Sequence, residues 1–365
     1  MSLSIGIVGL PNVGKSTLFN ALTKKSVLAE NYPFCTIDPS VGIIPVPDER
    51  LLKLSQMSKS AKTIPAIVEF IDIAGLVKNA SRGEGLGNQF LANIRETDAI
   101  AHIVRIFEDK SITHVHGEID PMNDIEIINL ELIMADFQTV SKRIGNLGKD
   151  IKKGNKKAIV EYEILKKVEN ALDSGKFASS IGLKNDEKEI IKSLCLLTVK
   201  KMLYVLNKKN GANNLDELKD ERFKKFLDFA EKTRSDFVVV DAGIENELSK
   251  INEKEKNEYR KKLGVLDDGI NELIKKSYFL LNLITFLTTR EKESRAWTIK
   301  NGSTAQEAGA AIHTDFKEKF IKAEIINWKD LQGAGSYANA RAKGLVRTEG
   351  KEYVIKDGDV VEFKI

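Results

Sequence analysis

The 365-residue sequence has few cysteines and no long apolar run. Its two cysteines, Cys35 and Cys195, are too few for a disulfide framework or a cysteine-based metal site. No apolar stretch reaches the roughly 20 residues that a membrane-spanning helix needs, and the first residues lack a signal-peptide pattern. We therefore expect a cytoplasmic protein without membrane contact, and we expect it to be a monomer.

An excess of charge of either sign is absent too. The sequence has 57 basic and 53 acidic side chains, which gives a net charge of +4. A balance of this kind does not indicate nucleic-acid binding by the whole surface, so only local clusters can support that function. The chain has 42% apolar and 30% charged residues, as is typical of a soluble globular protein. Its length suffices for roughly two or three domains.

The strongest motif is the segment GLPNVGKST, residues 9–17, which matches the phosphate-binding pattern G-x-x-x-x-G-K-[ST]. It follows an apolar run typical of a buried parallel strand and precedes a predicted helix over 18–22. This order points successive backbone N–H groups and a helix N-terminus at one anion. We predict that Lys15 reaches the outer phosphates of a nucleotide and that Ser16 is a ligand of Mg²⁺. The alternative is a glycine-rich turn that matches by chance.

Two later segments fit a nucleotide hydrolase. Thr36, in the proline-containing loop 31–40, is the candidate for a second Mg²⁺ ligand and γ-phosphate sensor. Its alternative is a turn residue that caps its own backbone. A second apolar run, 66–73, ends in the pattern Asp72-Ile-Ala-Gly75. There Asp72 can hold Mg²⁺ through water, and the Gly75 N–H can contact the γ-phosphate.

The residue that positions the attacking water is not evident from these motifs. Ras-like enzymes carry a glutamine directly after the glycine, but this chain has Leu76, so another group must take that role. His102 lies inside the predicted strand 98–107 and is interpreted as a core residue. His114 and His116 follow in a polar loop and could reach the site, and simple surface exposure is their alternative.

From residue 125 onward the apolar period is that of a helix. A returning apolar stripe begins at Tyr162 after a break at Gly154-Asn155, which predicts an antiparallel helical hairpin inserted into the α/β domain. The outgoing seam recurs at four- and three-residue spacing: Ile133, Phe137, Val140, Ile144, Leu147 and Ile151. Five lysines surround the turn and could contact a phosphate backbone or be merely solvated: Lys149, Lys152, Lys153, Lys156 and Lys157.

The candidate base-recognition motif departs from that of GTPases. A strand predicted over 202–206 is followed by Asn207-Lys-Lys-Asn210, where GTPases carry N-K-x-D. Asn210 lacks the carboxylate that accepts two hydrogen bonds from guanine, so the choice between ATP and GTP stays open. Asn207 can still contact a base. From residue 280 to the end, the order of two strands, a helix and later strands predicts a small ubiquitin-like α+β domain.

With these pieces in place, the chain resembles the YchF-type Obg-like ATPases, a branch of the translation-factor-related P-loop NTPases, over essentially its whole length. The residues that carry the resemblance are GLPNVGKST, NYPFCTIDP, the block 70–96 and the C-terminal unit, which resembles a TGS domain. The implied fold is a mostly parallel α/β P-loop domain with a helical coiled-coil insertion and a C-terminal β-grasp domain. The implied division assigns 1–128 with 200–277 to the NTPase domain, 129–199 to the coiled coil and 278–365 to TGS.

The resemblance also implies an activity: ATP hydrolysis with Mg²⁺, favoured by K⁺, and association with the ribosome or ribosomal RNA. Transferred by position, the phosphate-binding residues are Asn12, Val13, Gly14, Lys15, Ser16 and Thr17, and the metal ligands are Ser16, Thr36 and Asp72. Asn12 is the expected K⁺ ligand, His114 acts in hydrolysis, and Cys35 occupies a position linked to redox control. The family's base motif is usually N-x-x-E, from which Asn210 departs.

We therefore expect an ATP-hydrolysing switch that binds the ribosome in one nucleotide state. One alternative keeps the architecture but makes GTP the substrate. The other is a nucleotide-sensing binding module with negligible turnover.

Overall fold

The first domain is built around a six-stranded sheet of order β2-β4-β1-β5-β7-β9, in which only β2 runs antiparallel to its neighbour. All residues of β1 and β5 are buried, as expected for apolar strands covered on both faces. The strands are β1 (Ser4–Val8), β2 (Val41–Pro45), β4 (Ile67–Asp72), β5 (Ala99–Arg105), β7 (Lys201–Asn207) and β9 (Asp236–Val240). This computed structural model describes residues 3–25, 38, 40–73, 86–115, 117–263 and 269–365.

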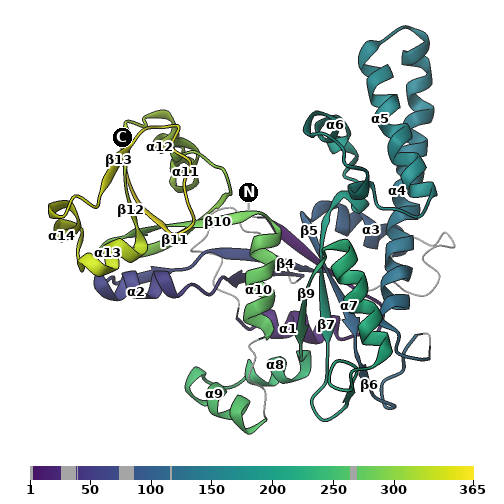
Figure 1. Ribbon diagram of the computed structural model, residues 1–365, viewed down its shortest axis with the longest axis horizontal. Coiled ribbons are helices and arrows are strands. Elements are labelled where there is room, and N and C mark those ends of the chain that lie inside the picture. Colours follow the sequence, from purple (N-terminus) through teal and green to yellow (C-terminus); the bar gives the residue numbers. More distant parts are fainter. Residues whose placement is uncertain (1–2, 26–37, 39, 74–85, 116, 264–268) are drawn as a thin grey trace.

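Helices cover both faces of this sheet (Figure 1). The helices α1 and α10 pack on one face, and α4 and α7 pack on the other. The helices of this domain are α1 (Lys15–Thr23), α3 (Leu86–Glu96), α7 (Glu221–Thr233), α8 (Ala242–Leu248), α9 (Glu253–Lys262) and α10 (Gly269–Leu280). A two-stranded ribbon of β6 (Phe107–Glu108) and β8 (Asn213–Asn214) lies beyond the ends of β5 and β7.

A long helical arm leaves the first domain through α4 (Pro121–Lys152) and returns through α5 (Lys156–Asp173). Its predicted seam is confirmed, because Ile133, Val140 and Leu147 are buried against α5 and the alternate seam residues are partly buried. Short elements bring the chain back to β7: η3 (Ala178–Ile181), α6 (Asn185–Ile191), η4 (Lys192–Leu194) and η5 (Leu197–Val199).

The C-terminal domain has a second six-stranded sheet, of order β13-β12-β14-β10-β11-β3. Helices α11 and α12 close a separate apolar core on one face of this sheet. Its elements are β10 (Leu283–Thr289), β11 (Glu293–Lys300), α11 (Ala305–Ile312), α12 (Thr314–Glu318), β12 (Lys322–Asn327), α13 (Trp328–Ala334), α14 (Tyr337–Ala342), β13 (Arg347–Glu349) and β14 (Asp359–Lys364). The predicted mostly parallel α/β domain with a helical insertion and a separate α+β domain is thus confirmed.

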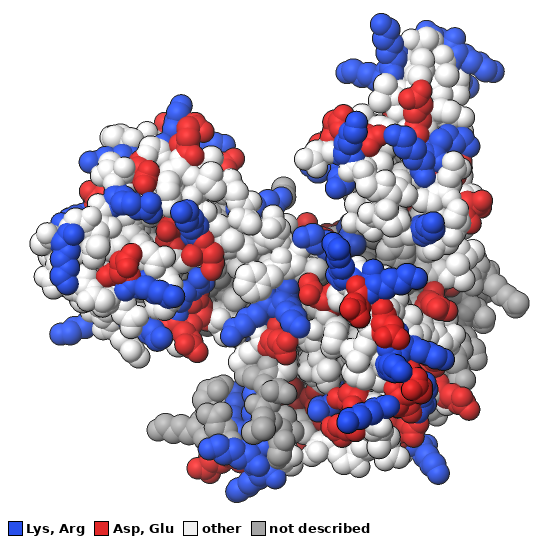
Figure 2. All heavy atoms as spheres, viewed as in Figure 1, with Lys and Arg blue, Asp and Glu red and all other residues white. Residues whose placement is uncertain are grey.

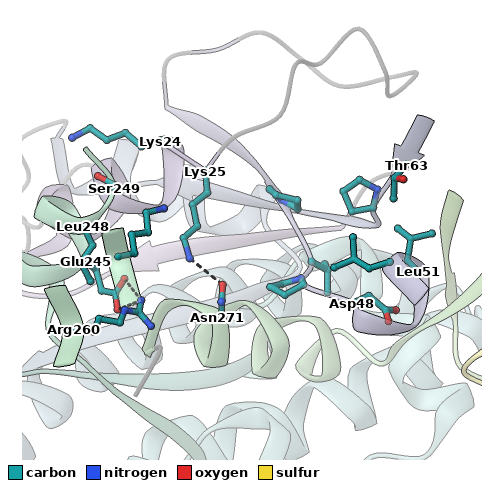
Figure 3. A pocket seen from close by; sticks show the side chains of 16 residues that line it. Lys24, Lys25, Asp48, Leu51, Thr63, Glu245, Leu248, Ser249, Arg260 and Asn271 are labelled. Atoms are coloured by element: carbon teal, nitrogen blue, oxygen red, sulfur yellow. Dashed lines mark hydrogen bonds and ion pairs between the residues drawn. The ribbon is translucent and has the colours of Figure 1, made fainter. Parts of the chain in front are cut away.

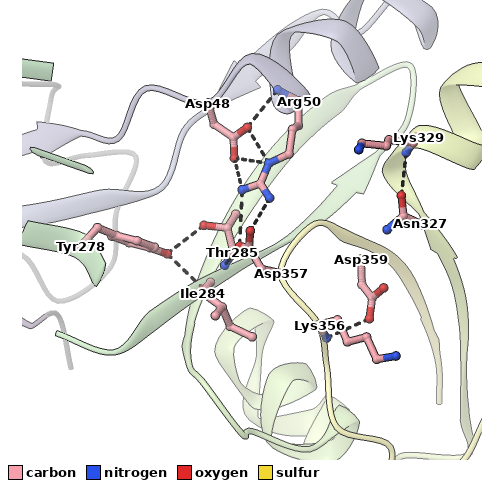
Figure 4. A network of polar contacts seen from close by, with 10 residues as sticks. All are labelled: Asp48, Arg50, Tyr278, Ile284, Thr285, Asn327, Lys329, Lys356, Asp357 and Asp359. Carbon is pink, nitrogen blue, oxygen red and sulfur yellow. Dashed lines mark hydrogen bonds and ion pairs between the residues drawn. The ribbon is translucent and has the colours of Figure 1, made fainter. Parts of the chain in front are cut away.

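Two elements from the first part of the sequence join the C-terminal domain. Strand β3 (Lys62–Ile64) pairs in parallel with β11, and helix α2 (Glu49–Met57) packs against the same sheet. Arg50 of α2 donates to both carboxylate oxygens of Asp48 and to Asp357, whose Oδ1 accepts from the Thr285 N–H at 2.9 Å (Figure 4). The segment between β2 and β4 therefore connects the first domain to the C-terminal domain.

The surface of the structure agrees with the balanced composition. Figure 2 shows acidic and basic side chains mixed over most of the visible face, whereas Lys and Arg gather at the free end of the arm. Among the residues that the structure describes, no helix combines the length and the apolar character that a membrane crossing requires.

Candidate nucleotide-binding and hydrolysis site

The phosphate loop, residues 9–17, follows β1 and continues into α1, which begins at Lys15. Gly14 precedes this helix with φ 99°, a left-handed conformation that favours glycine. A Cβ at Gly14 would lie 2.3 Å from Nδ2 of Asn207, so the close approach of these two segments also requires glycine. Val13 is fully buried and anchors the loop in the core. The backbone N–H groups at the start of α1 are thereby held in place for an anion.

Lys15 lies beneath the phosphate loop. Only 8% of the residue is exposed, and its Nζ donates to the carbonyls of Gly9 at 3.0 Å and Leu10 at 2.7 Å. Burial lowers the pKa of Lys15 to about 8, and the negative charge of Asp72 opposes this shift. The ammonium is thus held by two neutral acceptors, which phosphate oxygens can replace at a gain in charge compensation.

Asp72 and Ser16 carry oxygen atoms of the kind that magnesium ions prefer as ligands in proteins. Asp72 is the last residue of β4 and pairs with Ile7 of β1, the strand that leads into the phosphate loop. Burial raises the pKa of Asp72, and Lys15 partly offsets this. Ser16 is exposed at the beginning of α1. Within the described ranges no group of three or more His, Cys, Asp and Glu residues could hold a metal ion.

Several of the predicted site residues lie outside the described residues. They are Cys35, Thr36, Gly75, Leu76 and His116. Their assigned roles therefore stay predictions from the sequence.

The Asn207 side chain braces the phosphate loop. Its Nδ2 donates to the Val13 carbonyl at 2.8 Å, and its Oδ1 accepts from the Ala242 N–H at 3.1 Å. The residue is 5% exposed. A prediction that assigned Asn207 only to the base therefore missed this structural role, which ties together the loops after β1 and β9. One N–H of Nδ2 is left for a nucleotide.

The loop that carries Asn210 is also held by the segment that follows β9. Its backbone N–H donates to Oδ2 of Asp241 at 2.6 Å, and Asp241 also caps α8 by accepting from the Ile244 N–H. Burial raises the pKa of Asp241. Because this carboxylate accepts two backbone hydrogen bonds, it serves the loop rather than replacing the acidic residue missing at position 210.

His114 is buried, so the alternative of simple surface exposure is wrong. Its side chain is 2% exposed, and Nε2 lies 3.0 Å from Oδ2 of Asp124, which is equally buried. The preceding residue touches the phosphate loop, because Nδ2 of Asn12 donates to the Thr113 carbonyl at 3.1 Å. His102, by contrast, is a fully buried core residue as predicted, and burial lowers its pKa to about 3.

Arg105 shapes the loop that leads to His114, and its role was not predicted from the sequence. Its guanidinium donates to the carbonyls of Phe107 at 3.0 Å, Ile112 at 3.1 Å and Asp109 at 3.1 Å. Arg105 is 1% exposed, and its Cζ lies 4.4 Å from the centroid of the Phe107 ring. A charged residue inside the apolar run 99–107 is the signal that could have marked it, since a buried charge needs such partners.

A pocket of about 530 Å³ lies at the far end of α1 (Figure 3). Lys24 and Lys25 line it, with Lys25 donating to Asn271 at 3.0 Å. Arg260 and Glu245 also line the pocket and form an ion pair at 3.0 Å. No residue of the phosphate loop lines this pocket, so it is separate from the phosphate site.

Two family models match parts of the chain. Residues 4–136 match a model described as "50S ribosome-binding GTPase". Residues 283–365 match the model YchF-GTPase_C, described as "Protein of unknown function (DUF933)".

Several relatives match the chain from end to end. A "Ribosome-binding ATPase YchF" from Bacillus subtilis (strain 168) is 49% identical over 368 residues, with 100% of this chain and 99% of the relative covered. The protein of the same name from Haemophilus influenzae is 46% identical over 365 residues, with the same coverage. A solved structure described as "Structure of the Schizosaccharomyces pombe YchF GTPase" has a TM-score of 0.87 at 38% identity and covers 100% of this chain and 98% of its own. These matches confirm the predicted P-loop fold.

Proposed function

Because the chain belongs to the YchF family, we propose that it is a Mg²⁺-dependent ATPase whose nucleotide state controls association with the ribosome. The observation that carries the proposal is the placement of Lys15. Its buried ammonium donates to two carbonyls of the phosphate loop, and the half-buried carboxylate of Asp72 ends β4, the strand next to β1. Such an arrangement suits the charge of a triphosphate and of a metal ion.

We assign the phosphates to the loop from Asn12 to Thr17, with Lys15 on the outer phosphates. Ser16, Asp72 and Thr36 would hold Mg²⁺, which would neutralise the charge that develops on the phosphates. Asn12 is the proposed K⁺ ligand through its Oδ1, because its Nδ2 already donates to the Thr113 carbonyl. The Gly75 N–H would contact the γ-phosphate. We also propose that Cys35 has the role in redox control that the family resemblance implies.

For the chemical step we propose that His114 takes over the task that Leu76 cannot perform. The oxygen of a water molecule attacks the γ-phosphorus, the bond from that phosphorus to the β–γ bridging oxygen breaks, and ADP leaves. His114 orients the water and accepts its proton. The position of His114 in the chain supports this role, because the carbonyl of the preceding residue, Thr113, accepts from Asn12 of the phosphate loop at 3.1 Å.

The ribosome contact is proposed for the free end of the arm together with the C-terminal domain. All five lysines of the arm's turn are exposed. The polar contacts that join α4 to α5, from Arg143 to Glu161 and from Ser141 to Glu169, lie elsewhere along the arm. Phosphate backbone is the partner that such a lysine cluster fits.

The division of the chain and its setting are proposed on the same basis. We propose an NTPase domain (1–128 and 200–277), a coiled coil (129–199) and a TGS domain (278–365), in a cytoplasmic monomer. The separate apolar cores of the arm and of the C-terminal domain support this division.

GTP hydrolysis is the second candidate, because the solved relative is described as a GTPase. Asn210 argues for ATP, since an amide offers guanine one acceptor where a carboxylate offers two. Losing that pairing should cost guanine about 1–3 kcal/mol, roughly one to two decades in affinity.

Competition calorimetry with ATP, GTP, ADP and GDP tests the choice of nucleotide. We expect ATP to bind at least as well as GTP, and Asn210→Asp to move the preference towards GTP. Binding of GTP more than tenfold tighter than ATP by the unaltered protein would reject ATP as the substrate. Turnover measured with and without ribosomes then separates a switch, which ribosomes stimulate, from a sensor that they do not.

A further inference from the structure

A second and larger pocket lies at the edge of the first sheet that is opposite the phosphate loop. Its volume is about 960 Å³, which is enough for several side chains of a ligand or partner. Lys201 and Asp236, the first residues of β7 and β9, line it, and the arm borders it through Asn129 and Ile133 of α4. Asn207, which contacts the phosphate loop, is the last residue of β7. The pocket is therefore separate from the proposed nucleotide site.

The floor of this pocket is apolar and partly open to solvent. Met202 of β7, Phe229 of α7 and Phe177 of the segment that returns from the arm are half-buried there. Phe279, the last residue but one of α10, also lines the pocket and is 68% exposed. Phenylalanine and methionine are enriched where proteins bind other proteins. This floor therefore offers a partner an apolar surface to cover.

Basic side chains surround the apolar floor. Four of the basic lining residues are exposed: Lys176, Lys201, Lys232 and Arg234. Within the described part of the chain none of these four has an ion-pair partner. Lys166 and Lys167 of α5, by contrast, each form an ion pair with a glutamate, at 2.6 Å and 2.7 Å. The pocket thus has a positive charge that its own surroundings leave uncompensated, and such a charge attracts a negatively charged partner.

We propose that this pocket is the docking site for an acidic segment of a protein partner, which carries an apolar side chain between its carboxylates. The apolar side chain covers Phe279 and Met202, and the carboxylates pair with the four exposed cations around them. This contact is distinct from the ribosome contact proposed for the free end of the arm, and it does not depend on ATP hydrolysis.

Nucleic acid is the other polyanion that a basic pocket could attract. Proteins that hold single strands offer successive rings for base stacking and cations along the path of the backbone. Among the described lining residues, Phe279 is the one ring that is largely exposed, and Asp236 lies among the cations, where it repels a phosphate chain. The Asp236 carboxylate and the Thr233 hydroxyl can instead accept backbone N–H groups of a peptide. The lining therefore favours a protein segment.

The test uses the full chain and a short synthetic peptide with one phenylalanine between aspartates and glutamates. Three other probes are compared with it: the peptide with alanine for phenylalanine, the peptide with lysine for every acidic residue, and a short single-stranded RNA of the same net charge. Fluorescence anisotropy gives the affinities, and ¹³C-methyl NMR of the methionines locates the site. The chain has five methionines, of which Met202 lines the pocket and Met57 of α2 is an internal control.

We expect the acidic peptide with phenylalanine to bind at least about tenfold more tightly than each of the other probes. It should shift the methyl signal of Met202 and leave that of Met57 unchanged. Phe279→Ala should weaken this binding about fivefold or more, as the loss of an anchoring contact does. Lys176→Glu combined with Lys232→Glu should weaken it at least as much. All three side chains are exposed, so these variants should fold normally.

Matched controls change exposed residues outside the pocket. Leu218→Ala removes an apolar side chain that is 58% exposed, and Lys224→Glu with Lys225→Glu reverses two charges of α7. These controls should leave the affinity within a factor of about 2. Equal losses in the controls, peptide binding without a shift of Met202, or no binding of any probe would overturn the docking site. Binding of the RNA as tight as that of the peptide would overturn it in favour of nucleic acid.

Discussion

The arm and the C-terminal domain both join the nucleotide-binding domain, but they do so at opposite ends of its sheet (Figure 1). The arm begins beyond the carboxyl end of β5, where Asp124 meets His114 next to the phosphate loop. The C-terminal domain is joined at the amino end of the sheet through α2 and β3, which lie between β2 and the start of β4. The arm therefore contacts a residue of the proposed chemistry directly through Asp124, whereas the C-terminal domain is joined through α2, β3 and α10.

This difference predicts two separable kinds of effect. Changes at the root of the arm should alter the rate of hydrolysis with little change in affinity. Changes at the junction with the C-terminal domain should alter stability, and they should leave the rate of hydrolysis nearly intact.

The largest effect should come from the phosphate loop itself. Lys15→Ala removes the charge under the phosphate loop and should abolish hydrolysis, with a reduction of at least about 10³-fold, because it removes stabilisation of the transferring phosphoryl group. Ser16→Ala should have a similar result because it removes a metal ligand. Phosphate release from ATP is the measurement, and normal turnover by either variant would mean that the phosphate loop has no part in hydrolysis.

The free end of the arm should affect partner binding rather than the basal rate. Replacing Lys152, Lys153, Lys156 and Lys157 by Glu should weaken ribosome binding. It should also reduce the slope of log affinity against log salt by about 0.7–0.9 for each phosphate that the arm no longer neutralises. A matched variant changes four other exposed lysines, on α7 and α9: Lys224, Lys225, Lys261 and Lys262. Equal slopes for the two variants would mean that the turn of the arm is merely solvated.

The junction with the C-terminal domain is broken most directly at Arg50. Arg50→Ala leaves the Asp48 and Asp357 carboxylates without their shared guanidinium, which should lower the free energy of unfolding by about 1–3 kcal/mol. Arg290→Ala is the control, because that ion pair to Glu362 is largely exposed and should contribute less than about 1 kcal/mol. Denaturant unfolding gives the stabilities. A fall in the rate of ATP hydrolysis by Arg50→Ala as large as that of His114→Ala would remove the distinction between the two appendages.

The smallest predicted effect is a proton taken up with ATP. The pKa of Lys15 without nucleotide is lowered to about 8, and phosphates favour its charged form and so raise it. Above pH 8 the free protein has lost this proton, so ATP binding must restore it and affinity must fall as pH rises. Calorimetry at pH 9 in buffers of different ionisation enthalpy should show uptake approaching one proton, and at pH 7 almost none. Equal uptake at both pH values would assign the proton to another group.

The sequence predicted best the features that depend on local pattern. The phosphate loop and the seam of the arm were predictable because a short motif and a heptad period carry them. Strand β3 was missed because three residues give no period, and its partner β11 lies more than 200 residues away in the sequence. The burial of His114 was missed for a similar reason, because its loop looks polar and the pairing with Asp124 and the support from Arg105 appear only in three dimensions.

The base site shows the same limit. The motif at 207–210 suggested contact with the nucleotide, but it could not show that Asn207 is engaged by Val13 and Ala242. Both partners come from segments distant in the sequence. Residue type alone therefore could not reveal the structural role of Asn207, and its contact with a base stays a prediction.

The most direct test of the proposed mechanism is the effect of His114→Ala on kcat and on ATP affinity, measured on the same preparation. General acid–base catalysis contributes about 10²–10⁴-fold, so we predict a fall in kcat in that range with ATP affinity nearly unchanged. A variant that keeps kcat and binds ATP more weakly would place His114 in binding, and it would contradict the claim that the root of the arm meets the chemistry there.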